Sequence, residues 1–304
     1  MDGLGGDVGS ADSDGFEEHR PYLGAVAYRL LGSFSDAEDA VQDTWLRWRG
    51  VDRSQVQDVR AYLTKVVTRV CYDALGSARA RRESYVGEWL PEPQVLGEHT
   101  PESVAVAGES VSLALLAVLE QLSPAQRVAF VLHDVFAVGF EEIGAALERS
   151  PESVRQLAAR ARRDVRRRSP HREVDAQAHL KAVAAFAAAA AGADMAALVD
   201  VLAPDVVWHS DGGGVVSAGL RPIVGAVRVG RLALALAAKW LAPETGVLTR
   251  VAVVNGEMGL VNYLPSGEPF GVTAFTVVDG RITEIYVVVN PEKFSGVARI
   301  TVTS

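Results

Sequence analysis

Apolar residues recur at helical spacing through the first 170 residues. They fall on one stripe of each segment and leave polar side chains on the opposite face. Helices are predicted over the segments 33–48, 59–75, 123–136 and 139–150, and within the segment 150–171. Start signals accompany three of them: capping boxes at Ser35 with Glu38 and at Ser123 with Gln126, and an N-cap at Ser150 before Pro151. This part of the chain is predicted to be all-α.

The pattern changes after residue 172. Two further helices, about 175–191 and 194–203, precede a strand over 205–211 and a helix over about 221–240. Segments rich in β-branched residues follow, separated by glycine-containing turns. Helices first and then a long antiparallel meander predict an α+β domain in which a curved sheet wraps around helices.

Composition suggests where these parts begin and end. Residues 1–15 are polar, rich in glycine and aspartate, and expected to be disordered. Residues 84–108 form a linker rich in Pro, Gly and Glu, without periodicity. Domains are therefore expected over 16–83, 109–172 and 173–304.

The 304-residue chain has a formal net charge of −8 and one cysteine. A single cysteine, Cys71, excludes an intramolecular disulfide and a cysteine-based zinc site, and we expect an inert structural thiol. No window of 18 apolar residues is present, and the N-terminus lacks a signal-peptide pattern. We therefore expect a cytoplasmic protein with no metal, no cofactor and no membrane partner.

The helix over 33–48 has an unusual outer face. A leucine lies there among acidic and amide side chains: Asp39, Gln42, Asp43 and Leu46. An exposed aliphatic side chain gains most when a partner covers it, so this face is a candidate protein-binding patch. The alternative is a single exposed leucine with no function, which is common.

The helix over 59–75 alternates aromatic and basic residues on its outer arc. These residues are Tyr62, Lys65, Arg69 and Tyr72. Aromatic rings stack on unpaired bases while cations hold phosphates, so the arc suits single-stranded nucleic acid. The alternative is an amphipathic helix whose long side chains extend their polar ends to water.

Positive charge is concentrated near residue 160. Nine arginines and only two acids lie between Arg149 and Arg172. A short helix, a tight break at Glu148–Arg149 and a second helix with a basic outer face predict a helix-turn-helix. Arginine and glutamine near the start of the second helix, at Arg155 and Gln156, can reach base edges in the major groove. The alternative is a helical hairpin without DNA-binding function.

Two of these segments resemble a known family. The sequence DAEDAVQDTWLRW, residues 36–48, closely resembles the region 2.2 signature of bacterial RNA polymerase sigma factors. The sequence GFEEIGAALERSPESVRQLAARAR, residues 139–162, resembles region 4.2. With no region 3 between them, the chain resembles an extracytoplasmic-function (ECF) sigma factor. The linker motif YVGEWLPEP and the additional C-terminal domain are similar to the SigJ-like subgroup, which carries a SnoaL-like domain after region 4.

The resemblance implies a role for each face. The face with Asp39, Gln42, Asp43 and Leu46 would bind core RNA polymerase, and the strip with Tyr62, Lys65, Arg69 and Tyr72 would hold the melted −10 element. The −35 element of promoter DNA would be contacted by one face of the second helix: Arg155, Gln156, Ala159, Arg160 and Arg163. The linker would extend towards the polymerase catalytic cleft.

The C-terminal segment resembles the cone-shaped SnoaL/nuclear-transport-factor-2-like fold, which encloses a pocket, so a small-molecule ligand in the cone is a further candidate partner. The Asp-Gly-Gly-Gly-Lys motif of the subgroup is present as Asp211, Gly212, Gly213 and Gly214, but Val215 replaces the lysine. The closing motif is Asn290-Pro291-Glu292-Lys293. We expect the linker residues Trp89, Leu90, Pro91, Glu92 and Pro93 to contact the glycine motif and regulate the protein.

Catalysis by the C-terminal domain is not expected. His209 and Asp211 share one face of a strand and could in principle form a general acid–base pair. Asp211 begins a glycine turn, however, and capping that turn is the simpler role. An alternative function for the whole chain is a DNA-binding regulator fused to a ligand-binding or cyclase-like domain, which would need neither the polymerase-binding face nor the single-strand strip.

Overall fold

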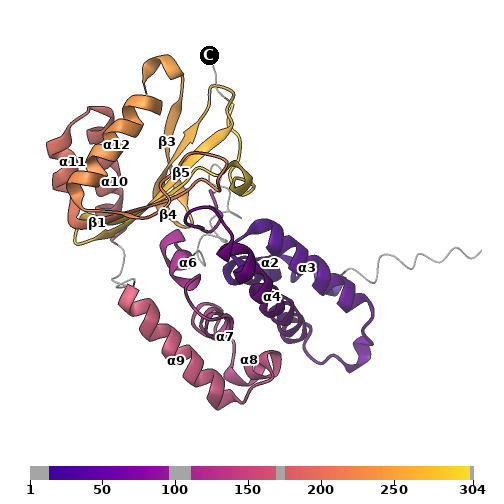
Figure 1. The fold of residues 1–304 in the computed structure, drawn as a ribbon. Coiled ribbons are helices and arrows are strands. Elements are labelled where there is room, and N and C mark those ends of the chain that lie inside the picture. The colour runs from indigo at the N-terminus through magenta and orange to yellow at the C-terminus, as the bar shows by residue number, and fades with distance from the viewer. Residues whose placement is uncertain (1–13, 96–110, 169–174, 241, 302–304) are drawn as a thin grey trace, which may run out of the picture. The chain divides into compact units, whose positions relative to one another are not determined.

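The computed structural model describes residues 14–95, 111–168, 175–240 and 242–301. They belong to two compact units (Figure 1). One consists of Met1–Arg81 with Glu120–Asp164, and the other of Arg82–Leu119 with Val165–Ser304. Most of the N-terminal segment expected to be disordered, and the linker beyond Val95, lie outside the described residues.

The first unit is helical. Its N-terminal part contains α1 (Asp14–Glu17), α2 (Arg20–Leu31), α3 (Phe34–Arg49), a 3-10 turn at Arg53–Gln55, and α4 (Val59–Glu83). Its second part contains α7 (Pro124–Phe130), which continues into a π-helical turn at Val131–Val135, then α8 (Phe140–Leu147) and most of α9 (Pro151–Arg168). The helices predicted from periodicity are present, and α4 runs further than the predicted end at residue 75.

Two of the three predicted helix starts are confirmed. Ser123 and Gln126 form a reciprocal capping box at the start of α7. The Ser150 hydroxyl accepts a hydrogen bond from the Ser153 amide at 3.2 Å. The capping box predicted at Ser35 is wrong: α3 begins two residues earlier, with Ser33 as its N-cap. Gly32 ends α2 in the left-handed conformation, so the chain turns sooner than the pattern indicated.

The break between α8 and α9 is a tight turn. Glu148 ends α8 with φ of 54°, and the Arg149 amide donates to the Gly144 carbonyl at 3.0 Å. A Cβ atom at Gly144 would lie only 2.6 Å from the Arg149 carbonyl oxygen. Glycine at this position therefore allows the turn to close, and the predicted helix-turn-helix is present.

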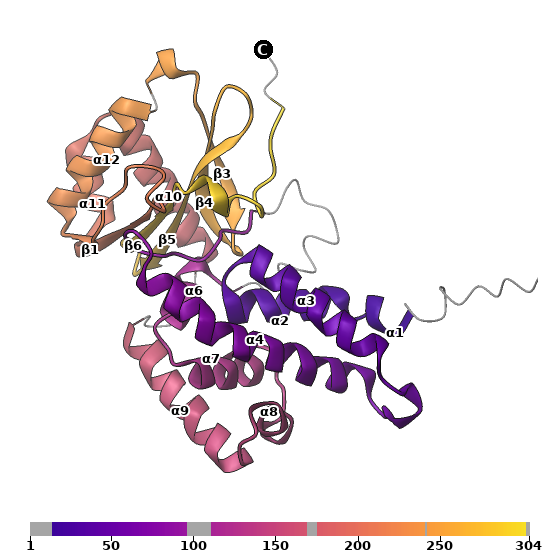
Figure 2. The same ribbon diagram turned by 45° about the vertical axis from the view of Figure 1, so that its right-hand side comes forward.

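The second unit is α+β. Its helices are α6 (Leu113–Leu119), α10 (Ala176–Ala191), α11 (Met195–Val201) and α12 (Ala226–Trp240). Its strands are β1 (Leu202–Asp211), β2 (Ile223–Val224), β3 (Leu248–Val254), β4 (Glu257–Tyr263), β5 (Pro269–Val278) and β6 (Arg281–Val288). The sheet order is β2-β1-β6-β5-β4-β3, with β1 and β6 parallel and the other pairs antiparallel. Figure 2 labels the strands from β1 to β3 in this order.

Turn chemistry fixes two hairpins of this sheet. Asn255 and Gly256 join β3 to β4, and Asp279 and Gly280 join β5 to β6. All four residues have positive φ, between 50° and 81°. Two-residue loops of this kind match the twist of the flanking strands, so the predicted meander of four strands forms as expected.

The two faces of the sheet are covered by different parts of the unit. One face packs on α10, α11 and α12 through a core that includes Phe186, Trp208 and Phe275. The other face packs on the linker and on α6, through a second core that includes Leu90, Val95 and Leu113 with Val261 and Val288. The segment that joins α4 to α7 is therefore anchored on the sheet at both of its described ends.

Candidate functional site

The outer face of α3 presents the predicted polymerase-binding residues to solvent. Asp39, Gln42, Asp43 and Leu46 are all exposed, and 54% of Leu46 is accessible. The opposite face is buried, and the Thr44 hydroxyl donates to the Ala40 carbonyl at 2.7 Å. The helix is thus held by its inner side while an aliphatic side chain remains uncovered.

The predicted single-strand strip on α4 is less uniform than its periodicity suggested. Lys65 is exposed, whereas Tyr62, Arg69 and Tyr72 are only partly exposed. The Tyr62 ring lies 5.7 Å from the Trp48 ring, centroid to centroid. A helical projection considers one helix alone, so it does not show when a neighbouring helix covers part of the arc.

Arg69 contacts the turn of the helix-turn-helix. Its Nη1 lies 2.9 Å from Glu148 Oε1 and donates to the Ala146 carbonyl at 3.4 Å. Its Nε is 3.7 Å from Asp73 on α4 itself. A guanidinium expected to meet DNA phosphates is therefore held by acidic and carbonyl oxygens in this structure.

The outer face of α9 presents most of the predicted −35 residues. Arg155, Gln156, Arg160 and Arg163 are exposed, and Ala159 is partly buried between them. The inner stripe, which includes Val154, Ala158 and Ala161, is completely buried. The Arg155 guanidinium lies 5.4 Å from the Phe140 ring centroid, so α8 helps to orient it.

In the second unit, Asp211 lies at the centre of a buried polar network. Its carboxylate accepts hydrogen bonds from the Tyr85 hydroxyl at 2.7 Å, the Leu90 amide at 2.8 Å and the Gly213 amide at 3.0 Å. Its Oδ2 atom is also 2.7 Å from Lys293 Nζ. Asp211 therefore caps the glycine turn, as expected, and also joins the linker to the sheet.

Lys293 supplies the cation of this network. Its ammonium also donates to the Leu90 carbonyl, and it lies 4.0 Å from the Trp89 ring centroid and 5.1 Å from that of Tyr85. Asn290 Nδ2 donates to the Tyr85 hydroxyl at 2.9 Å. We call the residues Tyr85, Trp89, Leu90, Asp211, Asn290 and Lys293 the linker clasp.

Sequence reasoning named part of the linker clasp and missed the rest. Trp89, Leu90 and Asp211 were expected to come together, whereas Tyr85, Asn290 and Lys293 were not assigned to the contact. Val215, at the position of the missing lysine, is 61% exposed, and Lys293 is the cation that pairs with Asp211. The Asn290-Pro291-Glu292-Lys293 motif was the available signal.

The rest of the linker motif is also anchored. Pro91, Glu92 and Pro93 are buried, and the Ser295 hydroxyl donates to Glu92 at 3.1 Å. The backbone of Gln94 exchanges two hydrogen bonds with Asn255, one from the Gln94 amide to the Asn255 side chain and one from the Asn255 amide to the Gln94 carbonyl.

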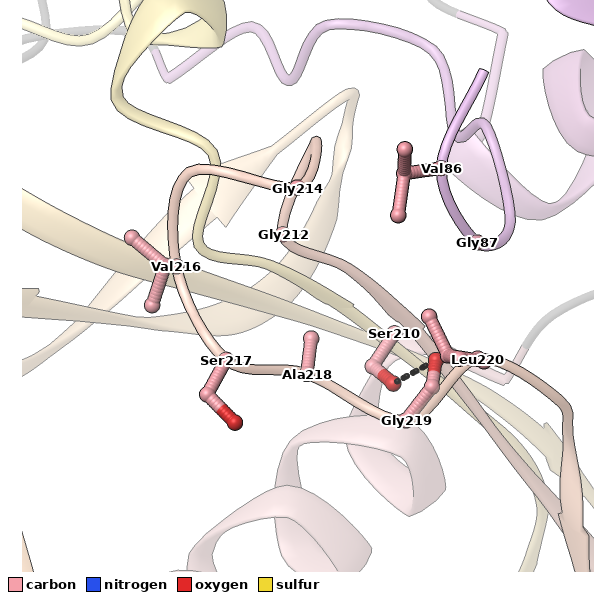
Figure 3. Close-up of a pocket in the computed structure, with 10 residues that line it drawn as sticks. All are labelled: Val86, Gly87, Ser210, Gly212, Gly214, Val216, Ser217, Ala218, Gly219 and Leu220. Carbon is pink, nitrogen blue, oxygen red and sulfur yellow. Dashed lines mark hydrogen bonds between the residues drawn. The ribbon is translucent and has the colours of Figure 1, made fainter. Parts of the chain in front are cut away.

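The glycine motif brings its backbone against the linker (Figure 3). Gly213 and Gly214 have φ of 62° and 75°, and a Cβ atom at Gly213 would collide with Asn290 and approach the Tyr85 hydroxyl. A surface hollow of about 400 Å³ lies between the loop Gly212–Leu220 and the linker residues Val86 and Gly87. Glycine is therefore required for this contact.

His209 and Asp211 do not form a pair. His209 Nδ1 lies 2.9 Å from Glu88 Oε1, and its ring stacks on Tyr286 at 4.9 Å. Asp211 instead belongs to the linker clasp, through Tyr85, Leu90 and Lys293. The arrangement holds the linker in place and provides no general acid–base couple at these residues.

Cys71 is buried, and burial raises its pKa to about 12. The described residues contain no cluster of three His, Cys, Asp or Glu side chains suited to a metal ion. In the part of the chain that the structure describes, no helix is long and apolar enough to cross a membrane.

Comparisons with known proteins agree with both units. The models of Sigma-70 region 2 and Sigma-70 region 4 match residues 16–81 and 112–165. The chain is 41% identical over 290 residues to the ECF RNA polymerase sigma factor SigJ of Mycobacterium tuberculosis, covering 92% of each chain. It is 32% identical over 282 residues to the probable ECF RNA polymerase sigma factor SigI of the same species, covering 92% of this chain and 93% of the relative.

A solved structure matches nearly the whole chain. The crystal structure of Mycobacterium tuberculosis SigJ matches with a TM-score of 0.76 at 39% identity, covering 93% of this chain and 98% of that one. Region 2, region 4 and the additional α+β domain are thus shared over nearly the whole length. The chain belongs to the extracytoplasmic-function family of RNA polymerase sigma factors, which direct the polymerase to its promoters.

Proposed function

We infer that this chain directs promoter recognition by core RNA polymerase and that its C-terminal domain regulates initiation through the linker clasp. Its proposed partners are core RNA polymerase and promoter DNA, and its proposed location is the cytoplasm. The α3 face would bind polymerase, the α4 strip would hold the melted −10 element, and the outer face of α9 would read the −35 element. We also propose the domain boundaries expected from the sequence, at 16–83, 109–172 and 173–304.

The observation that carries the regulatory role is the buried pairing of Asp211 with Lys293 across the linker. Asp211 is 0% exposed and Lys293 5%. Burying two charges is tolerated only where they are paired and further hydrogen-bonded, so the linker backbone at Leu90 completes a network that would otherwise be unfavourable. The linker is therefore bound specifically and not merely in contact.

Anchoring the linker restricts the distance between regions 2 and 4. An extended linker of about 30 residues could reach ~100 Å. With Leu90, Val95 and Leu113 packed on one sheet face, most of that reach is lost. A sigma factor must contact two separated promoter elements at once. Its ability to do so would therefore depend on whether the linker stays anchored on the sheet.

A regulatory role fits the domain better than catalysis or binding of a small molecule in the cone. Phe186, Trp208 and Phe275 are buried in one core between the helices and the sheet. His209, the candidate base, is engaged with Glu88. His209 and Asp211, the two candidate catalytic groups, thus both contact the linker.

The test compares point variants of the full chain in run-off transcription with core RNA polymerase. Deleting 173–304 would also uncover the apolar residues of α6 that pack on the sheet, so Asp211→Asn and Trp89→Ala are cleaner changes. Both should alter initiation at least several-fold in the same direction. The exposed Asp205→Asn on the same strand is the matched control and should have no effect. Unchanged initiation by both variants would exclude the regulatory role.

A further inference from the structure

Positive charge is segregated on one segment of the C-terminal domain. Residues 220–240 contain four basic side chains and no acidic one, although the whole chain has a formal net charge of −8. The four are Arg221, Arg228, Arg231 and Lys239. No base-reading motif was recognised in this segment from sequence.

Three of the four lie on the outer side of α12. Its inner side buries Ala226, Val229, Gly230 and Ala233, and the helix packs on α11 and β1. Arg228 and Arg231 are exposed and three residues apart, so they are neighbours on the helix surface. Lys239 is also exposed. It lies ~16 Å further along the helix axis than Arg228, because an α-helix rises about 1.5 Å per residue. We call Arg221, Arg228, Arg231 and Lys239 the α12 basic face.

Within the described residues, the arginines of this face have no ion-pair partner. The Lys239 ammonium lies 4.6 Å from the ring centroid of its neighbour Trp240. Two other cations of the same domain are paired: Lys293 with Asp211, and Arg299 with Glu268 at 2.9 Å. The α12 basic face thus presents uncompensated charge to solvent.

We propose that the α12 basic face binds the phosphate backbone of duplex promoter DNA. The contact goes beyond the proposed function, because it adds a DNA-binding surface outside regions 2 and 4. It rests on the proposed function in one respect only: that function makes promoter DNA the physiological target. Arginine binds phosphate through two parallel hydrogen bonds, and cations repeated along a helix suit a repeating row of anions.

Two features favour DNA over an acidic protein surface. The other exposed residues of α12 are Val227, Ala235, Ala238 and Trp240, so the helix lacks the amide and hydroxyl groups that complete most protein interfaces. DNA also repels an acidic chain except at surfaces where cations are concentrated, and the α12 basic face is such a surface. Tethering to DNA-bound regions 2 and 4 raises the effective concentration, so a weak contact is populated.

The experiment measures binding of the full chain to a mixed-sequence DNA duplex of about 40 base pairs, by fluorescence anisotropy between about 50 and 200 mM salt. The variant is Arg228→Ala with Arg231→Ala. The control is Lys181→Ala with Arg250→Ala, which removes two exposed cations from the same domain outside the α12 basic face. The salt slope is the slope of the logarithm of the binding constant against the logarithm of the salt concentration. Loss of two phosphate contacts should reduce its magnitude by about 2. Between the lowest and the highest salt, the affinity of the variant should therefore fall roughly tenfold less than that of the unaltered chain.

The outcomes separate the proposals. A reduced slope for the α12 variant with an unchanged slope for the control supports the DNA contact, whether or not the chain directs run-off transcription. Equal slopes for the variant, the control and the unaltered chain overturn it, as does failure of the unaltered chain to bind the duplex at the lowest salt. Weaker binding to core polymerase with an unchanged DNA slope assigns the face to an acidic protein surface and also overturns it.

Discussion

Lys293 Nζ lies 2.7 Å from Asp211 Oδ2, and both side chains are buried. The two residues come from different motifs: Asp211 is the last residue of β1 and Lys293 follows β6, and β1 and β6 are parallel neighbours. Their shared partner is the backbone of Leu90, whose amide and carbonyl both point at the pair. One ion pair therefore joins two strand ends and the linker.

Replacing Lys293 with methionine should strongly destabilise the C-terminal domain. The change leaves the Asp211 carboxylate buried without its cation, which typically costs about 3–5 kcal/mol. The measurement is hydrogen exchange of the full chain, read at peptides covering Leu90 and β1. Lys181→Met, at an exposed site, is the control. Combining Lys293→Met with Asp211→Asn should recover part of the lost stability. If the destabilisation of the double variant equals the sum of the two single effects, the two residues are not coupled and the prediction is wrong.

Replacing Leu46 and Asp39 together with alanine should abolish core polymerase binding while leaving the fold intact, because both side chains are exposed on α3. Loss of one leucine hot spot typically costs about 2 kcal/mol, or roughly thirtyfold in affinity. Co-purification with core enzyme provides the measurement. Leu180→Ala, an exposed leucine of the other unit, should leave binding unchanged. Retention of normal affinity by the double variant would remove the α3 face from the interface.

Two positions on α9 should determine sequence preference, and one should not. Arg155 and Gln156 lie near the start of the helix. Replacing either one with alanine should weaken −35 recognition by about 1–3 kcal/mol. Arg166→Ala, near the other end, should weaken binding to all sequences alike. Holoenzyme affinity for a promoter and for a scrambled duplex provides the comparison. Equal losses on both duplexes for all three variants would contradict the recognition-helix assignment.

Replacing Glu148 with glutamine should release Arg69 for nucleic acid. The pair is exposed, at 37% and 74% of the two side chains, so it contributes up to about 1 kcal/mol. Affinity of the full chain for a mixed-sequence single-stranded oligonucleotide should therefore rise by up to about fivefold. Glu152→Gln on α9 provides a control for the lost negative charge. If Glu148→Gln and Glu152→Gln increase affinity equally, general electrostatics and not the Arg69 contact is responsible.

Replacing Glu257 with glutamine should stabilise the C-terminal domain at alkaline pH. Burial raises the pKa of this carboxyl group from 4.5 to about 7. The folded state therefore binds the proton more tightly than the unfolded state, and stability falls as pH rises from about 4.5 to about 7. The variant should be more stable than the unaltered chain by about 1–3 kcal/mol at pH 8, with the gain disappearing near pH 4.5. Unfolding of the full chain followed at both pH values tests this, and a constant difference would contradict the titration.

Much of the helical unit was predictable because the determining signals are local. The outer residues of α3 and α9 follow from helical period alone, and the turn at Glu148 follows from the break in that period. Ser33 is the exception: two serines lie two residues apart, and the conformation of the preceding Gly32 selects the first. Hairpins at Asn255–Gly256 and Asp279–Gly280 were likewise readable, since their turn type depends on two residues.

The sequence by itself determined the family, the order of the domains and the outward faces of their helices, because periodicity and turn chemistry act over a few residues. Only the tertiary structure decided the partners of the charged groups. Arg69 meets Glu148 79 residues away, and Lys293 meets Asp211 at a separation of 82. Such pairs depend on helix packing and strand register, and a charge excluded from water must find its partner wherever the fold brings one close.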